Sequence, residues 1–328
     1  MQNFYFIGFG MTLRIAFQMD PIENINIDED TTFRIAEEAQ KRNHNIFYFL
    51  PEDLTFFEND LLCEGYELSI ERKHWQHFSL GSKIQLNLAN DIDILWLRQD
   101  PPFDMSYITS THLLDLLGNK TLVVNNPFWV RNYPEKILVL KYPDLIPPTI
   151  IGRNVGMLKS FKEKHGDVIV KPLYGNGGSG IFKIGENDPN LNSLIELFHN
   201  ISREPIIMQK YLPEVLSGDK RVILINGEPV GAINRIPEQG EIRSNMHVGG
   251  KAVRVELTSR DLEICNRIGP LMKEKDQVLV GLDIIGDMLT EINLTSPTGI
   301  QELERFDQIN VAEKIWDCLE LKLRGEFG

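Results

Sequence analysis

The apolar segments of this chain follow different patterns before and after Pro127. Residues 13–17 and 46–50 are short apolar runs typical of buried strands, and Asp30 between them can cap a helix that reaches Arg42. A strand, a helix and a strand within about 40 residues form a βαβ unit, which predicts parallel strands. We therefore expect an N-terminal α/β domain built on a parallel sheet.

The segments after Pro127 have the signature of antiparallel strands. Residues 168–170, 206–209 and 221–225 are short apolar runs separated by turn signals, and Asn226-Gly227 is a strong hairpin signal. The expected second part is therefore an α+β domain. We expect residues 1–10 to be a short extension with Met11 as an alternative start, residues 11–130 to form the first domain, and residues 131–328 to form the second.

The charge and cysteine content exclude several classes of protein. Lys and Arg number 34 against 47 Asp and Glu, a net charge of −13, which argues against a general binder of nucleic acid or of anionic membranes. No apolar run reaches the roughly 18 residues that a membrane span needs. The three cysteines lie far apart, which suits a reducing compartment without a disulfide framework or a zinc site. We expect a cytoplasmic protein.

A glycine-rich segment, residues 171–180, is the strongest candidate for phosphate binding. It begins with Lys171 and carries four glycines in six residues, so bare backbone N–H groups can face a phosphate. A dinucleotide-binding fold would need a helix next, but residues 181–184 have strand character, and the lysine and hydroxyl of a Walker A motif are missing. The segment predicts a hairpin tip over a triphosphate, and a flexible surface turn is the alternative.

Asp283, Glu291 and Asn293 form the candidate metal site, on a hairpin that turns at Gly286 and Asp287. Carboxylate and amide oxygens suit Mg²⁺. Glu291 and Asn293 are two residues apart on a strand and share a face. A two-residue loop would put Asp283 on the opposite face, whereas a three-residue loop would place it opposite Glu291, so the metal hypothesis requires the longer loop. A solvated acidic hairpin edge is the alternative.

Four arginines are candidates for binding carboxylate or phosphate groups: Arg98, Arg221, Arg235 and Arg243. Arg98 is the most suggestive, because it follows a buried strand at the sheet edge where α/β proteins bind ligands.

The glycine-rich segment and the Asp283…Glu291–Asn293 hairpin together resemble the ATP-grasp ligases. The closer resemblance is to the bacterial glutathione synthetase family, and it extends over nearly the whole chain from Met11 onward. The segments that carry it are residues 19–22, 98–104, 124–127, 218–221, 235–243, 281–293 and 295–298.

The resemblance implies a fold and a reaction. The fold is an α/β N-terminal domain and an ATP-grasp domain, which consists of a lid over residues 145–206 and a C-terminal antiparallel sheet, with residues 236–251 as a loop that covers the site. The reaction joins γ-glutamylcysteine and glycine to glutathione, with ATP converted to ADP and phosphate through an acyl phosphate. A different acid or amine substrate, and a non-catalytic nucleotide-binding protein, are the competing hypotheses. Self-association into a dimer or tetramer is also expected.

The resemblance also implies a role for each residue of the site. ATP would be bound by Lys136, Lys171, Gly175, Asn176, Gly177, Gly178, Ser179, Gln209, Lys210, Tyr211, Leu212 and Asp219. Mg²⁺, or Mn²⁺ in its place, would be held by Asp283, Glu291 and Asn293. Arg221 and Arg243 would stabilise the acyl phosphate and the tetrahedral intermediate. The peptide and glycine substrates would be bound by Arg98, Arg235, Asn245, Gly249 and Gly250.

Overall fold

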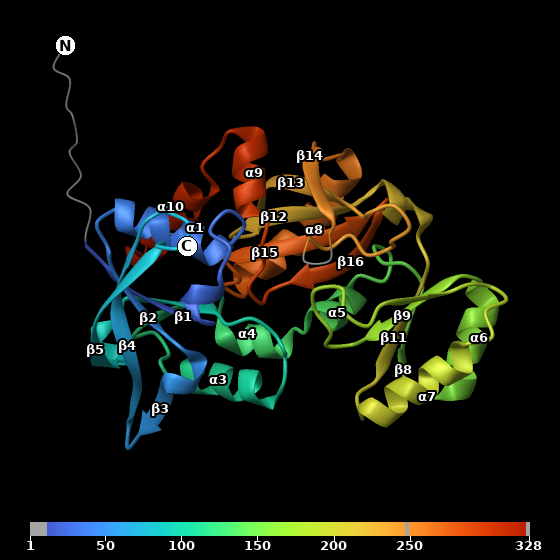
Figure 1. Ribbon diagram of the computed structural model, residues 1–328, viewed down its shortest axis with the longest axis horizontal. Coiled ribbons are helices and arrows are strands. Elements are labelled where there is room, and N and C mark those ends of the chain that lie inside the picture. Colours follow the sequence, from blue (N-terminus) through green and yellow to red (C-terminus); the bar gives the residue numbers. More distant parts are fainter. Residues whose placement is uncertain (1–11, 247–248, 326–328) are drawn as a thin grey trace, which may run out of the picture.

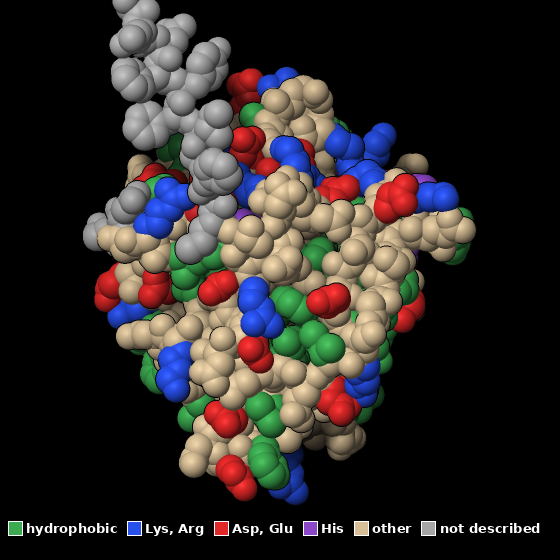
Figure 2. Space-filling model, turned by 90° about the vertical axis from the view of Figure 1, so that its left-hand side faces the viewer, with side chains coloured by type: hydrophobic (Ala, Val, Ile, Leu, Met, Phe, Trp, Pro, Cys, Tyr) green, Lys and Arg blue, Asp and Glu red, His purple; other side chains and the backbone are tan. Residues whose placement is uncertain are grey.

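The computed structural model describes residues 12–246 and 249–325, which form three β-sheets with helices packed against them (Figure 1). The expected extension at residues 1–10 and the start at Met11 lie outside the described residues. Within the described ranges, no helix is both long and apolar enough to cross a membrane. On the face that Figure 2 shows, acidic and basic side chains are interspersed.

The first sheet occupies the N-terminal part of the chain. Its elements are β1 (Arg14–Met19), η1 (Ile22–Asn24), α1 (Thr31–Lys41), β2 (Asn45–Phe49), η2 (Pro51–Asp53), β3 (Leu54–Phe57), β4 (Asp60–Ile70), β5 (Phe78–Asn87), α2 (Leu88–Asp91), β6 (Ile94–Arg98), α3 (Met105–Asp115), β7 (Leu122–Val124) and α4 (Pro127–Asn132). The strand order is β3-β4-β2-β1-β6-β7, with β5 paired to β4.

The predicted βαβ unit is confirmed, because β1 pairs in parallel with both β2 and β6. Asp30 caps α1 as predicted, with its Oδ1 accepting from the N–H of Phe33 at 2.5 Å. The prediction of a wholly parallel sheet is wrong on one side, where β3, β4 and β5 form antiparallel pairs. β4 alternates between buried and less buried residues, which is the pattern of a strand with one face in the core.

The second sheet has its own small core. Its strands and the neighbouring helices are α5 (Glu135–Leu138), η3 (Val139–Lys141), β8 (Thr149–Gly152), α6 (Val155–His165), β9 (Val168–Pro172), β10 (Phe182–Ile184), α7 (Leu191–Ile201) and β11 (Ile206–Lys210). The strand order is β10-β9-β11-β8, and α6 and α7 pack on this sheet at one end of the molecule (Figure 1). β9 and β10 are antiparallel, so the glycine-rich segment does connect the two strands of a hairpin, as predicted.

The third sheet is antiparallel throughout. Its elements are η4 (Pro213–Ser217), β12 (Asp219–Ile225), β13 (Glu228–Ile236), β14 (Lys251–Val255), α8 (Ser259–Glu274), β15 (Leu279–Ile285), β16 (Met288–Asn293), α9 (Ile300–Asp307) and α10 (Val311–Leu323). The strand order is β14-β13-β12-β15-β16. The predicted Asn226-Gly227 turn joins β12 to β13, and a Cβ on Gly227 would lie 2.4 Å from the carbonyl oxygen of Gly269.

The hairpin of β15 and β16 corrects one prediction. Ile285 pairs with Met288, so the loop has two residues, not the three that the metal hypothesis required. The register then shifts by one residue, because Thr290 is bulged, and Asp283 still lies opposite Glu291. The bulge, and not a longer loop, therefore places Asp283 opposite Glu291.

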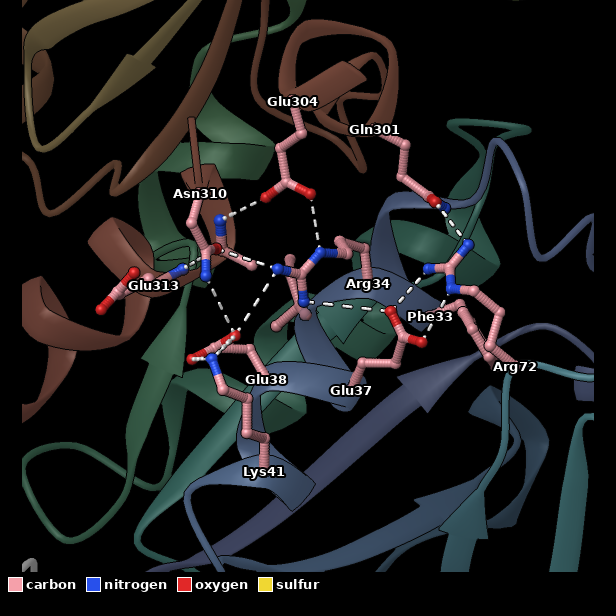
Figure 3. A network of polar contacts seen from close by, with 12 residues as sticks. Phe33, Arg34, Glu37, Glu38, Lys41, Arg72, Gln301, Glu304, Asn310 and Glu313 are labelled. Atoms are coloured by element: carbon pink, nitrogen blue, oxygen red, sulfur yellow. Dashed lines mark hydrogen bonds and ion pairs between the residues drawn. The ribbon is translucent and has the colours of Figure 1, made fainter. Parts of the chain in front are cut away.

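The first and third sheets share apolar cores. Trp316 of α10 is fully buried, and its indole N–H donates to the backbone carbonyl of Ile35 in α1. A polar network lies beside this contact, where Arg34 of α1 pairs with Glu304 of α9 at 2.7 Å (Figure 3). Helices from distant parts of the sequence thus hold the two sheets together.

Candidate active site between the second and third sheets

Charged residues of four strands lie on one face of the third sheet. On β12 and β13, Asp219 pairs with Arg235, and Arg221 of β12 pairs with Asp283 of β15. Asp283 in turn lies opposite Glu291 of β16. Because paired residues project to the same side of a sheet, the register alone gathers these five side chains.

Asp283 is the centre of a buried ion-pair network. Its Oδ1 accepts from Nε of Arg221 at 2.5 Å, and its Oδ2 lies 3.0 Å from Nη2 of both Arg221 and Arg235. Nη2 of Arg235 also donates to Oδ2 of Asp219 at 2.6 Å. Burial alone would raise the pKa of Asp283, but the two guanidinium charges outweigh it and hold the pKa well below its usual value.

Two lysines from outside the third sheet form ion pairs with Glu291. Its Oε1 lies 3.1 Å from Nζ of Lys171, at the end of β9, and 3.5 Å from Nζ of Lys136, on α5. Burial opposes ionisation of Glu291, and the two lysine charges nevertheless lower its pKa. Two cations on one carboxylate oxygen form a ready site for a more highly charged anion.

The glycine-rich segment closes over these lysines. Nζ of Lys136 donates to the carbonyl oxygen of Gly175 at 2.7 Å. Gly177 and Gly178 have φ values of 59° and 81°, which favour glycine. A Cβ on Gly178 would lie 2.9 Å from Oδ1 of Asn245, so the cover loop contacts the segment here and a side chain at Gly178 would displace the Asn245 amide.

A cavity that opens to solvent lies between the second and third sheets, and its volume is about 710 Å³ when the open space at its mouth is included. Ile169, Ile181, Leu212, Val215 and Ile285 form its apolar lining. Its charged part contains three basic and three acidic side chains, Lys171, Lys210, Arg243, Asp219, Asp283 and Glu291. An apolar slot beside lysine and arginine side chains is suited to a ligand that has a flat apolar part and anionic groups.

Asp219 presents an unused acceptor at this cavity. Its Oδ2 accepts from Arg235 and, at 2.9 Å, from the hydroxyl of Ser244, whereas its buried Oδ1 has no hydrogen-bond partner among the described residues. Burial raises the pKa of Asp219 to about 6 against the charge of Arg235. A ligand hydroxyl would satisfy this oxygen.

The structure brings most of the predicted site residues together. The large cavity is lined by the predicted residues Lys171, Gln209, Lys210, Tyr211, Leu212, Asp219, Arg243, Asn245, Asp283 and Glu291. An adjoining cavity of about 300 Å³ adds Lys136, Gly175, Asn176, Gly177, Gly178 and Ser179. Arg221, Arg235 and Asn293 lie close by on the same sheet and line neither cavity.

Four predicted substrate residues lie outside both cavities: Arg235, already described, and Arg98, Gly249 and Gly250. Arg98 is buried, and its guanidinium donates to the hydroxyl of Thr32 and to the carbonyl of Pro297. Gly249 and Gly250 lie at the end of the cover loop, where Gly250 packs against the backbone of Ser244. Residues 247–248 of that loop lie outside the described part.

A divalent cation fits part of the predicted ligand set. Asn293 donates its amide to the carbonyl of Gly281, and within the described chain its Oδ1 accepts no hydrogen bond. Both lysines contact Oε1 of Glu291, so the second carboxylate oxygen, Oε2, remains for a cation. Asp283 differs, because arginines occupy both of its oxygens. In the described ranges, no three carboxylate, imidazole or thiol side chains converge on one point.

Comparison with known proteins shows to which family the chain belongs. Residues 13–131 match the N-terminal domain of prokaryotic glutathione synthetase, and residues 135–308 match the ATP-grasp domain of the same family. The chain belongs to the prokaryotic glutathione synthetase family. The glutathione synthetase of Brucella melitensis is 50% identical over 95% of this chain and 100% of its own length. That of Salmonella typhimurium is 40% identical over 95% of this chain and 99% of its own length.

Solved structures show the same fold. D-cycloserine synthetase DcsG has a TM-score of 0.67 at 13% identity, over 94% of this chain and 99% of its own. D-alanyl-alanine synthetase A from Vibrio cholerae has a TM-score of 0.63 at 17% identity, over 95% of this chain and 98% of its own. The chain therefore has the ATP-grasp fold, and as a member of the glutathione synthetase family it is an ATP-dependent ligase.

Sequence reasoning missed several residues at this glutathione synthetase site. The hydroxyl of Ser244 donates to Asp219, and the hydroxyl of Thr295 donates to the half-buried carboxylate of Glu135 at 2.5 Å. Thr295 belongs to a segment that carried the family resemblance, so its position was a usable signal. Neither Ser244 nor Glu135 stands in a pattern that distinguishes it from a surface residue.

Proposed function

We propose that this ligase joins γ-glutamylcysteine to glycine, forming glutathione and converting ATP to ADP and phosphate. Support comes from relatives named glutathione synthetase that align over 95% of the chain at up to 51% identity. The observation that carries the chemistry is the pair of lysines, Lys136 and Lys171, on one oxygen of Glu291 beneath the glycine-rich segment.

The first step moves the terminal phosphoryl group of ATP to the carboxylate of γ-glutamylcysteine, because a free carboxylate is a poor electrophile. Lys136 and Lys171 would neutralise the phosphates, and free backbone N–H groups of the glycine-rich segment would donate to them. Arg243 lines the same cavity and pairs with Glu241 at 2.6 Å, and in the proposed reaction its guanidinium would contact the transferred group. The amine of glycine then attacks the acyl phosphate, and phosphate leaves.

The acyl phosphate must be kept from water. The described part of the cover loop, residues 236–246 and 249–251, is anchored by the hydrogen bond from Ser244 to Asp219 and packs on Gly178 through Asn245. A loop in this place limits hydrolysis of the intermediate.

Glu291 and Asn293 would hold Mg²⁺, or Mn²⁺, with phosphate oxygens and water completing the coordination shell. The cation would supply positive charge that offsets the charge of the triphosphate. Asp283 as a third ligand stays a prediction, and its two arginine contacts count against it. Arg221 as a catalytic group and Arg98 as a carboxylate-binding group also stay predictions.

ADP formation tests the proposed reaction. The purified chain is mixed with ATP and Mg²⁺, with or without γ-glutamylcysteine and glycine, and a metal-free sample serves as the control. We expect ADP release that depends on both substrates and on the metal, with glutathione as the product. Release that needs a different acid would identify another ligase of this fold.

The Glu291→Gln variant tests whether the site is catalytic. Loss of the charge beside two lysines and of a predicted metal ligand should lower ADP formation at least about 100-fold. A variant that binds ATP and turns over like the parent would count against the site, and a parent that binds ATP without any turnover would favour the non-catalytic alternative.

A cytoplasmic location and a dimer or tetramer stay predictions.

A further inference from the structure

Thr149 and Gln209 form a hydrogen-bonded pair at the edge of the large cavity. They are direct neighbours on β8 and β11, and Nε2 of Gln209 lies 3.0 Å from Oγ1 of Thr149. The hydroxyl of Thr149 lies 2.7 Å from the carbonyl oxygen of Pro147. Gln209 is only 5% exposed, and both Gln209 and Pro147 line the cavity.

The chemistry of this chain fixes the direction of each hydrogen bond. The carbonyl of Pro147 can only accept, so the single proton of the Thr149 hydroxyl is used in that bond. Thr149 can then only accept from Gln209, which must direct its NH₂ group at the hydroxyl. The Oε1 atom of Gln209 is thereby turned away from Thr149, and no described residue donates a hydrogen bond to it.

The register places this oxygen away from the phosphate end of the cavity. Gln209 lies opposite Ile169 on β9, and Lys171 follows two residues later on the same face of that strand. Two residues of a strand span roughly 7 Å. Ile169 is the direct neighbour of Gln209, and Leu212 and Val215 also line this cavity, so apolar side chains are present for a flat base.

We propose that Thr149 is a positioning residue that sets the base preference of the nucleotide site by holding the amide of Gln209. This inference rests on the proposed use of ATP. A fixed acceptor at Oε1 matches the 6-amino group of adenine, which donates. It opposes the 6-oxo group of hypoxanthine or guanine, which also accepts, so two lone pairs would face each other.

Direct binding measurements separate this idea from the ligation reaction. Dissociation constants for ATP and for inosine triphosphate are measured by calorimetry with Mg²⁺, and their ratio is the readout. Inosine triphosphate carries the 6-oxo group without the 2-amino group of guanine, so it isolates the effect of position 6. A purely structural role for Thr149 would weaken both nucleotides alike and leave the ratio unchanged.

The expected result is a loss of selectivity in Thr149→Val. Without the Thr149 hydroxyl, the side-chain amide of Gln209 can rotate by 180° at little cost. The preference for ATP should fall about tenfold, the size of one unsatisfied buried hydrogen bond. Thr149→Ser keeps the hydroxyl and should keep the preference. Thr121→Val is the matched control, because the buried hydroxyl of Thr121 donates to the carbonyl of Leu88 at 2.6 Å in the first domain.

Gln209→Leu provides a second route if Thr149→Val does not fold, and it should lose the preference as well. An unchanged ratio in either variant, or a loss of preference in Thr121→Val, would overturn the proposal. ADP formation with γ-glutamylcysteine is measured on the same samples. Parent protein that prefers ATP without ligation activity would refute the proposed reaction and leave this inference standing.

Discussion

At the scale of single residues, the candidate site balances its own charge. Asp283 is held by two arginines and Glu291 by two lysines, and all of these side chains are largely buried. In the proposed reaction, nucleotide phosphates would therefore compete with Glu291 for Lys136 and Lys171. A cation that binds the freed carboxylate would complete the exchange, so nucleotide and metal should bind cooperatively.

His44 is a buried residue away from the site with a testable effect on stability. Its Nδ1 accepts from the N–H of Leu13, and burial lowers its pKa although Glu320 lies near its other nitrogen. The folded protein then binds fewer protons than the unfolded chain, so the free energy of unfolding should fall as the pH drops through about 6.5.

Urea unfolding at pH 7.5 and pH 5.5 measures this effect. His44→Asn keeps an acceptor for Leu13 but does not titrate, so its unfolding free energy should depend less on pH than that of the parent. Equal pH dependence in the two proteins would contradict the role assigned to His44.

Residue types at the site could be predicted from the sequence, but their partners could not. Lys171, Glu291 and Asn293 were named from their spacing and chemistry. Nothing in the sequence indicates that Asp283 accepts from Arg221, 62 positions away, because that contact exists only through the pairing of β12 with β15.

At the scale of elements, the glycine-rich segment is held from two sides. Tyr174, just before its glycines, stacks on Phe103 of the N-terminal domain, with ring centroids 5.9 Å apart and planes inclined by 26°. Phe103 contacts the buried Tyr107 of α3 in turn. Asn245 of the cover loop approaches the segment at Gly178.

Tyr174→Ala should loosen the segment and weaken ATP binding. A stacked aromatic pair contributes about 1 kcal/mol, so the KM for ATP should rise about fivefold. Tyr174→Phe should behave like the parent. The control is Phe182→Ala, which removes a ring of the same hairpin whose aromatic neighbour, Phe198, belongs to the second sheet's own core. An unchanged KM in Tyr174→Ala would exclude a positioning role for the stack.

Local sequence patterns predict individual helices and turns more reliably than they predict how the strands pair. The helix after Asp30 and the Asn226-Gly227 hairpin were predictable because a cap and a turn act over a few residues. The bulge at Thr290 was not, since no local signal marks it. The antiparallel strands β3–β5 were overlooked, although β4 alternates in burial with a period of two.

At the scale of the whole molecule, α1 joins the first sheet to the C-terminal helices. Arg34 pairs with Glu304 at 2.7 Å and with Glu38 at 3.5 Å, and it donates to the side chain of Asn310 (Figure 3). Nearby, Arg72 joins Glu37 to Gln301 (Figure 3). Contacts so distant in sequence could not be predicted from the sequence alone, because only the assembled core brings these helices together.

Arg34→Ala should destabilise the whole protein. The change leaves the buried carboxylate of Glu38 and the partly buried Glu304 without this partner, at a cost of about 2 kcal/mol, between the values for exposed and fully buried pairs. Arg267→Ala is the control, because its pair with Asp144 is exposed and should contribute less than about 1 kcal/mol. Urea unfolding followed by tryptophan fluorescence, to which the buried Trp96 and Trp316 contribute, compares the two variants, and equal losses would contradict the role assigned to Arg34.

The extra residue in β16 restricts how the length of this hairpin can vary. Side chains alternate between the two sides of a strand, so adding or removing a single residue between Gly286 and Glu291 reverses the parity of everything that follows. Glu291 and Asn293 would then face away from Lys171, while the strand itself could still pair. Length changes that preserve the site must therefore come in even steps, or be matched by a change on the facing strand.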